Sequence, residues 1–331
     1  MNTKILLACS LITYFLVGCI SFNNPTHTSV VSTSTPQSTT SPTLFIKPTI
    51  TLTSTFIAPT FEAIPTLGTD ESFSSLRNYL KNEPPCQLPC LLGIRPGQST
   101  FLEVKKILAE FSGISNDLYF KQVTDIWVVG ILGVDINEGN SVIGFRSHFV
   151  TKIDKDVILY TGFRAYPDNY REGNTYADED HNNLLFAYTL PQIVQTYGLP
   201  TQTLMTADLN VSEPTSPDDF IIRVLYPELG IFIKYDMPME IKENTYKFCV
   251  SEAIIDLTII SEEYRHNYQE FFKETNDEWE WVTSAKSISI SNPFLKSTKD
   301  AIKLDDEDFY DKLISSPNQC FESPINIWPE P

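Results

Sequence analysis

One pattern occurs twice along the chain: an amphipathic helix followed by four segments with the composition of β-strands. The first helix is predicted directly after Thr100, because apolar residues then recur at helical spacing and Glu103 completes a capping box with Thr100. The second is predicted over Leu190–Tyr197, between a Thr189 cap and a stop at Gly198. Two such units predict a mixed fold with antiparallel sheet.

The eight predicted strands are rich in Val, Ile, Phe and Tyr, and Asn137–Asn140 and Pro227–Gly230 supply hairpin turns. They are Leu118–Val123, Ile126–Val134, Ser141–Val150 and Val157–Tyr166, then Thr201–Ala207, Phe220–Tyr226, Ile231–Met237 and Ala253–Ile260. We expect an α+β fold of two tandem modules, each with helices on one face of a four-stranded antiparallel sheet. The modules cover residues 71–167 and 184–260, and residues 261–331 form a C-terminal extension packed on the body.

The N-terminal residues 1–18 have the character of a lipoprotein signal peptide. Lys4 precedes an apolar run, Ile5–Val17, whose thirteen residues are fewer than the roughly 20 that span a bilayer. The sequence Leu16-Val17-Gly18-Cys19 resembles the lipobox of bacterial lipoprotein precursors. That resemblance implies lipidation of Cys19, cleavage before it, and a chain anchored by lipid to the extracytoplasmic face of a bacterial membrane. The alternative is an ordinary secretory signal cut elsewhere.

Residues 19–70 have the composition of a tether. Of the fifty residues Ser21–Asp70, fourteen are Thr, seven Ser and six Pro, and such a composition favours extended, hydrated conformations over a packed core. Dense Ser and Thr with Pro also allow O-linked glycosylation. A short helix is predicted after this tether, over Ser72–Asn82, and another near the C-terminus, over Asp305–Ile314.

Four cysteines remain in the body, Cys86, Cys90, Cys249 and Cys320. In an oxidising compartment four cysteines form two disulfides, with three possible connectivities. We favour Cys86–Cys90, because neighbouring prolines force a turn, and Cys249–Cys320, which would join the C-terminal part to the body. A redox-active or zinc-binding pair is the alternative. The C-x3-C spacing and the lack of a second Cys/His pair at ligand spacing argue against it.

Two further resemblances concern the body. The unit opened by Ile94–Thr100, and again by Leu190–Pro200, resembles the modules of the SmpA/OmlA outer-membrane assembly lipoproteins and of beta-lactamase inhibitor protein. This implies a module that makes protein contacts and carries no catalytic residues. The body is also similar to a group of exported bacterial lipoproteins without assigned activity, through Cys86-Gln87-Leu88-Pro89-Cys90, Gly93–Gly97, Phe309-Tyr310, Cys320, Pro324 and Trp328, although Leu91 or Leu92 replaces a Trp of that group.

Charge argues against nucleic acid as a partner. The chain has 42 acidic and 24 basic residues, a net charge of -18, and residues 1–70 contribute two of each sign. Phosphate backbones need clustered Lys and Arg, which the sequence lacks. We expect no cofactor and no metal. Calcium could be imagined at Asp305–Asp308, or at Asp178–Asp180 with Asp168, Glu172 and Asn174, but without an EF-hand loop a solvated acidic face is favoured.

Catalytic motifs are missing from the sequence: we find no nucleophile elbow, P-loop, zinc-protease helix or dinucleotide fingerprint. His27, His148, His181 and His266 are dispersed, and Asp180-His181 is favoured as a loop contact. We therefore expect no enzyme but a protein-interaction module with an unknown protein partner. The alternative is an extracellular hydrolase or carbohydrate-binding protein, with paired carboxylates beside Trp279 or Trp281.

Overall fold

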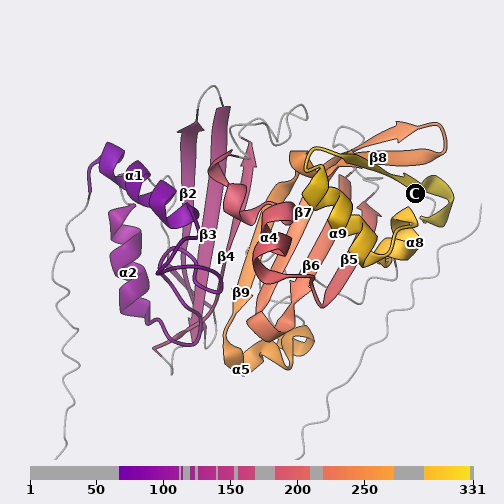
Figure 1. Cartoon of the computed structure of the whole chain (residues 1–331). Coiled ribbons are helices and arrows are strands. Elements are labelled where there is room, and N and C mark those ends of the chain that lie inside the picture. Colours follow the sequence, from indigo (N-terminus) through magenta and orange to yellow (C-terminus); the bar gives the residue numbers. More distant parts are fainter. Residues whose placement is uncertain are drawn as a thin grey trace, which may run out of the picture. The chain divides into compact units, whose positions relative to one another are not determined.

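Eight antiparallel strands form one continuous sheet in the computed structural model (Figure 1). The structure describes residues 67–111, 113–114, 120–123, 126–138, 141–152, 156–167, 183–208, 219–271 and 294–328. The strand order is β1-β2-β3-β4-β9-β7-β6-β5. The strands are β1 (Phe120–Val123), β2 (Ile126–Glu138), β3 (Ser141–Lys152), β4 (Ile158–Pro167), β5 (Gln202–Asp208), β6 (Asp219–Tyr226), β7 (Ile231–Lys242) and β9 (Ile254–Ile260).

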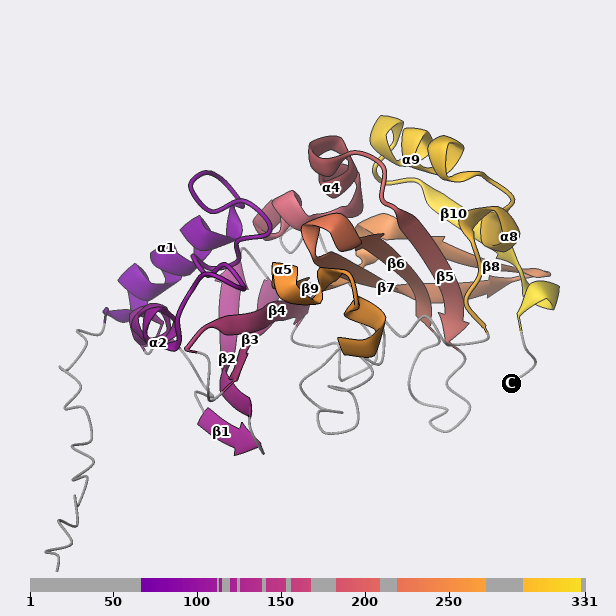
Figure 2. The ribbon, with the colours of Figure 1, turned by 90° about the horizontal axis from the view of Figure 1, so that it is seen from below.

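The main helices lie on one face of this sheet, which we call the helix-bearing face (Figure 2). They are α1 (Thr69–Leu80), α2 (Phe101–Glu110), α4 (Leu190–Tyr197) and α9 (Asp306–Ser315). The Tyr235 hydroxyl on β7 donates to the Tyr188 carbonyl just before α4, at 2.9 Å. Alternate β7 residues therefore face these helices, and the large core lies between helices and sheet.

The other face of the sheet, which we call the opposite face, carries a second and smaller apolar cluster. It includes Tyr160 of β4 and Phe232 of β7, with Phe271 from the segment after α5 (Glu262–Arg265) packed on Tyr160 at 5.5 Å between ring centroids. Strands β6 and β9, and β7 from Ile231 to Met237, are thus buried on both faces, which explains why these segments are mostly apolar.

The local signals in the sequence mostly produce the expected geometry. At α2 the Thr100 amide donates to the Glu103 carboxylate at 2.6 Å, and the Glu103 amide donates to the Thr100 hydroxyl at 3.3 Å, so the capping box is confirmed. Gly198 ends α4, and its amide donates to the Val194 carbonyl. Thr189 precedes α4 as expected, but its hydroxyl donates to the Phe186 carbonyl instead of capping the helix.

The turn between β6 and β7 requires glycine. Gly230 has a φ of +69°, in the left-handed region, and a Cβ placed there would lie 2.6 Å from the Ile260 carbonyl oxygen. Any side chain would therefore clash with the backbone of β9 as well as strain the turn.

The expectation of separate four-stranded sheets is wrong. All eight predicted strands exist, but β4 and β9, the last strand of each set, pair with each other from Tyr160↔Ile260 to Ala165↔Ile255. Each would otherwise be an edge strand with unpaired backbone groups, and the pairing satisfies both edges at once. The coarse prediction of an α+β fold with helices beside an antiparallel sheet is confirmed.

The C-terminal part is held by two short strands that the sequence analysis missed. β8 (Thr245–Cys249) pairs with the end of β7, and β10 (Cys320–Pro324) pairs with β8. Cys249 and Cys320 face each other in that register and form a disulfide, and Cys86 and Cys90 form the other. Both disulfides are those favoured from the sequence.

Candidate functional site: a charged row on the opposite face

Five charged residues on five neighbouring strands form one cross-strand row. The register pairs Arg146 with Arg164, Arg164 with Asp256, Asp256 with Lys234, and Lys234 with Arg223. Directly paired residues of an antiparallel sheet project to the same face, which here is the face of Phe232 and Tyr160. Four cations and one acid thus cross a sheet that is otherwise mostly apolar.

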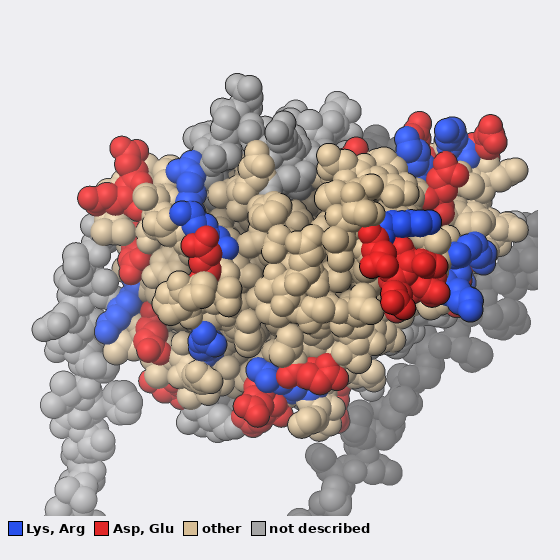
Figure 3. Space-filling model, viewed as in Figure 1, with Lys and Arg blue, Asp and Glu red and all other residues tan. Residues whose placement is uncertain are grey.

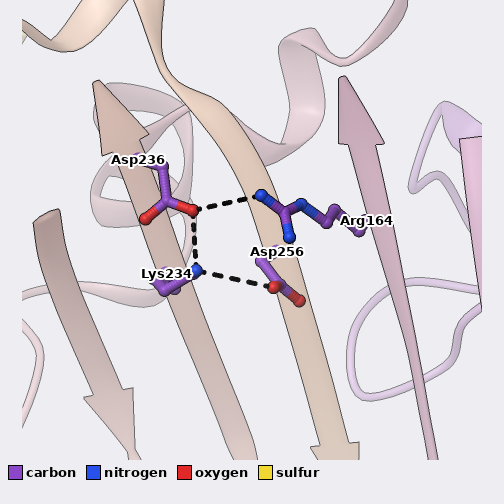
Figure 4. A network of polar contacts seen from close by, with 4 residues as sticks. All are labelled: Arg164, Lys234, Asp236 and Asp256. Atoms are coloured by element: carbon purple, nitrogen blue, oxygen red, sulfur yellow. Dashed lines mark ion pairs between the residues drawn. The ribbon is translucent and has the colours of Figure 1, made fainter. Parts of the chain in front are cut away.

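Two acids compensate two of these cations (Figure 4). The Lys234 Nζ lies 2.6 Å from the Asp236 Oδ2 and 3.9 Å from the Asp256 Oδ2. The Arg164 Nη2 lies 3.6 Å from the same Asp236 oxygen, and its side chain is 40% exposed. The Lys234 and Asp256 side chains are only 9% and 4% exposed, so this network is largely removed from water.

Arg146, which is exposed, and Arg223 of β6 are the two cations of the row that this network leaves out. Arg223 is 4% exposed, and its Nε and Nη1 atoms have no hydrogen-bond partner among the described residues. Burial lowers the pKa of Arg223 to about 10, so the guanidinium is still charged at neutral pH. Its paired neighbours are Lys234, a like charge, and the apolar Leu204.

Asp219, at the start of β6, is an acid whose pKa is strongly raised. Burial, and then repulsion from Asp236, raise the pKa of this carboxyl to about 7, although Lys234 and Arg164 act in the other direction. The Asp219 Oδ1 is buried without a hydrogen-bond partner in the described part of the chain. A carboxyl with this pKa exchanges its proton near neutral pH.

We expect Asp219→Asn to stabilise the protein above neutral pH. The folded pKa of Asp219, about 7, lies above its ordinary value of 3.8, so its stabilising effect is complete below pH 3.8 and is lost as the pH rises through 7. At pH 8 the variant should exceed the wild type in free energy of unfolding by on the order of 2 kcal/mol, and at pH 4 the two should agree. Urea unfolding across this range measures the difference, with the exposed Asp311→Asn as control. An equal difference at pH 4 and pH 8 would contradict the pKa.

His148 of β3 lies on the same face, beside Tyr160, at 5.6 Å between ring centroids. Burial lowers the pKa of His148 to about 4, and its Nε2 has no described hydrogen-bond partner. Its effect on stability is complete above pH 6.5 and is lost as the pH falls towards 4, opposite in sign to that of Asp219. Both the wild type and Asp219→Asn contain His148, so its pH-dependent contribution cancels when the stabilities of the two proteins are compared.

The site residues named from the sequence are only partly described. Asp305–Asp308 lie exposed at the start of α9, where the Asp305 carboxylate accepts from the Asp308 amide at 3.0 Å, as a solvated acidic face with a cap. His266 is exposed. No group of three or more His, Cys, Asp or Glu able to hold a metal occurs within the described ranges. Outside those ranges lie Cys19, His27, Asp168, Glu172, Asn174, Asp178–Asp180, His181, Trp279 and Trp281.

The sequence contained one signal for the charged row. Arg223 stands inside Phe220–Tyr226, Lys234 inside Ile231–Met237 and Asp256 inside Ile254–Ile260, three strands that are otherwise mostly apolar. A charge within such a strand implies a paired or functional group, because an isolated buried charge is strongly unfavourable. Which charges become neighbours depends on the strand order, which the sequence does not show.

Comparisons with protein-family models, with curated proteins and with solved structures found no match to this chain. Among the described residues, no helix combines the length and the apolar character needed to cross a membrane. Functional inference therefore depends on the chain's own residues and their geometry.

Proposed function

We propose that this chain is an exported, lipid-anchored protein that acts by binding, without catalysis, at the extracytoplasmic face of a bacterial membrane. The observation that carries the proposal is the pair of disulfides in the body, Cys86–Cys90 and Cys249–Cys320. Disulfides persist in oxidising compartments, so they support export independently of the lipobox-like sequence at Cys19.

A surface on the helix-bearing face supports protein contact. The stretch from Asn183 to Ala207, which includes α4, contains no charged residue, and the centre of this face is uncharged in Figure 3. Phe186 and Leu199 are 61% and 53% exposed there. Such a surface suits a protein partner with an apolar contact area, since anionic headgroups and nucleic acid would require cations.

The order of elements supports a two-module origin for this body. The helix α2 directly precedes β1–β4, and α4 precedes β5, β6, β7 and β9, with the short β8 between the last two. Each half thus contributes a helix and then four strands of the eight-stranded sheet. In this proposal the two modules share one sheet, and their helices together present the binding face.

Replacement of Cys19 by Ala is expected to move the protein from the membrane pellet to the soluble extracytoplasmic fraction. The reason is that acyl chains contribute about 0.8 kcal/mol per buried methylene, and no other anchor is proposed. Fractionation with immunoblotting measures the distribution, and mass spectrometry measures the lipid on Cys19. Cys9→Ala, which alters the other N-terminal cysteine, is the matched control and should stay in the pellet. If Cys19→Ala also stays in the pellet, the lipid anchor is wrong.

The alternative of an extracellular hydrolase stays a prediction. Glycoside hydrolysis needs one protonated and one ionised carboxyl. Asp236 and Asp256 both form ion pairs with Lys234. Asp219 is the carboxyl of this face with a pKa suited to the acid role.

A further inference from the structure

Arg223 is a buried charge that Asp236 and Asp208 attract from a distance, but it has no counter-charge in direct contact. No described carboxylate lies within 4.0 Å of its guanidinium, and two of its nitrogens lack hydrogen-bond partners among the described residues, although the residue is 4% exposed. A guanidinium does not escape this situation by losing its proton. An unsatisfied buried charge is strongly unfavourable, so its retention points to a partner outside the described chain.

The neighbours of Arg223 increase the need for an anion. Lys234 is its direct cross-strand partner, and like charges placed opposite each other destabilise a sheet. Asp236 is the next residue after Lys234 on the same face of β7. Its Oδ2 already forms ion pairs with Lys234 at 2.6 Å and with Arg164 at 3.6 Å. Asp236 therefore forms its ion pairs with Lys234 and Arg164. Arg223 is left with attraction from Asp236 and Asp208 over more than 4.0 Å, and with no ion pair of its own among the described residues.

We propose that Arg223 holds an anion-binding site on the opposite face of the sheet, which takes a small ligand bearing a phosphate or carboxylate group. The planar guanidinium forms charge-assisted hydrogen bonds to both groups. Such an anion would supply the missing acceptors and would reduce the repulsion between Arg223 and Lys234. The site does not involve the uncharged surface around α4, and it does not require the lipid anchor.

Calorimetric titration of the purified protein tests the site, with inorganic phosphate in one arm and citrate in the other. Sodium chloride keeps the ionic strength constant, because general screening would otherwise imitate binding. The wild type should bind at least one probe, and the arm that binds identifies the anion class. Arg223→Met should bind it about tenfold more weakly or worse, as expected for the loss of a charge-assisted hydrogen bond. Arg77→Met on α1 is the matched control and should bind as the wild type does.

Thermal unfolding without probe separates a binding role from a structural one. Arg223→Met removes an unpaired buried charge, so its unfolding midpoint should equal or exceed that of the wild type. If this variant does not fold, Arg223→Lys provides the same test, because it keeps the charge but loses the planar donor set, and it should bind the probe more weakly than the wild type. The proposal is overturned if the wild type binds neither probe, or if the Arg223 variant that folds binds as tightly as the wild type. It is also overturned if Arg223→Met unfolds at a lower midpoint than the wild type.

Discussion

Lys234→Met is expected to lower the free energy of unfolding by about 3 to 5 kcal/mol, because it leaves the Asp236 and Asp256 carboxylates buried without their shared cation. Met has a similar length and packs well beside apolar neighbours, so the loss would come from charge and not from a cavity. Equilibrium unfolding in urea measures the difference, and the slope of the transition should not change.

The chain contains a matched control for this experiment. Lys247 of β8 lies 3.7 Å from Glu240, in a pair whose side chains are 36% and 70% exposed. Lys247→Met should change stability by less than about 1 kcal/mol, because exposed ion pairs contribute little. A second comparison replaces Lys234 by Met together with Asp236 and Asp256 by Leu. The combined variant should recover most of the loss, since an apolar replacement of a whole buried network is often neutral. Equal losses in the Lys234 and Lys247 variants would show that the buried network does not stabilise the fold.

Removal of the Cys249–Cys320 disulfide is the second large effect that we expect. Replacing both cysteines by Ser should lower the free energy of unfolding by about 4 kcal/mol, because the disulfide closes a loop with a sequence separation of 71. It joins β8 to β10, so its loss should also release the C-terminal segment, whose Trp328 indole donates to the Ser323 hydroxyl at 2.9 Å. Urea unfolding gives the energy, and hydrogen exchange of β10 shows the local release.

The Cys86–Cys90 disulfide is the internal comparison. Its sequence separation is 4, and the chain-entropy account assigns such a short loop about 2 kcal/mol. The double Ser variant at Cys86 and Cys90 should therefore be clearly more stable than the one at Cys249 and Cys320. The opposite order would mean that native contacts around these cysteines, and not loop length, determine their contribution.

The sequence predicted the positions of the main elements well, because their signals are local. The capping box at Thr100 and Glu103 begins α2 as predicted, and Gly198 ends α4. The turn at Pro227–Gly230 joins β6 to β7. Strands β8 and β10 were missed, because each has five residues and their mixed composition resembles a loop.

The candidate site was predicted much less well. The candidates in the sequence included the acids Asp305–Asp308, which are exposed, and four dispersed histidines, whereas Arg223, Lys234 and Asp256 were not among them. Each of these three stands in a different strand, and the spacing between them along the chain has no motif. Their proximity comes from the strand order β9-β7-β6 and the register Asp256↔Lys234↔Arg223.

The sequence by itself determined where most of the main helices and strands lie, because caps, turns and alternating apolar residues act over a few neighbouring positions. It also favoured the cysteine pairing that the structure shows. Only the tertiary structure decided that β4 joins β9, and so that two sets of four strands become one sheet. Backbone hydrogen bonds between strands are the same for every sequence, so the choice of neighbour depends on how side chains distant along the chain pack together. The charged row exists because of that choice.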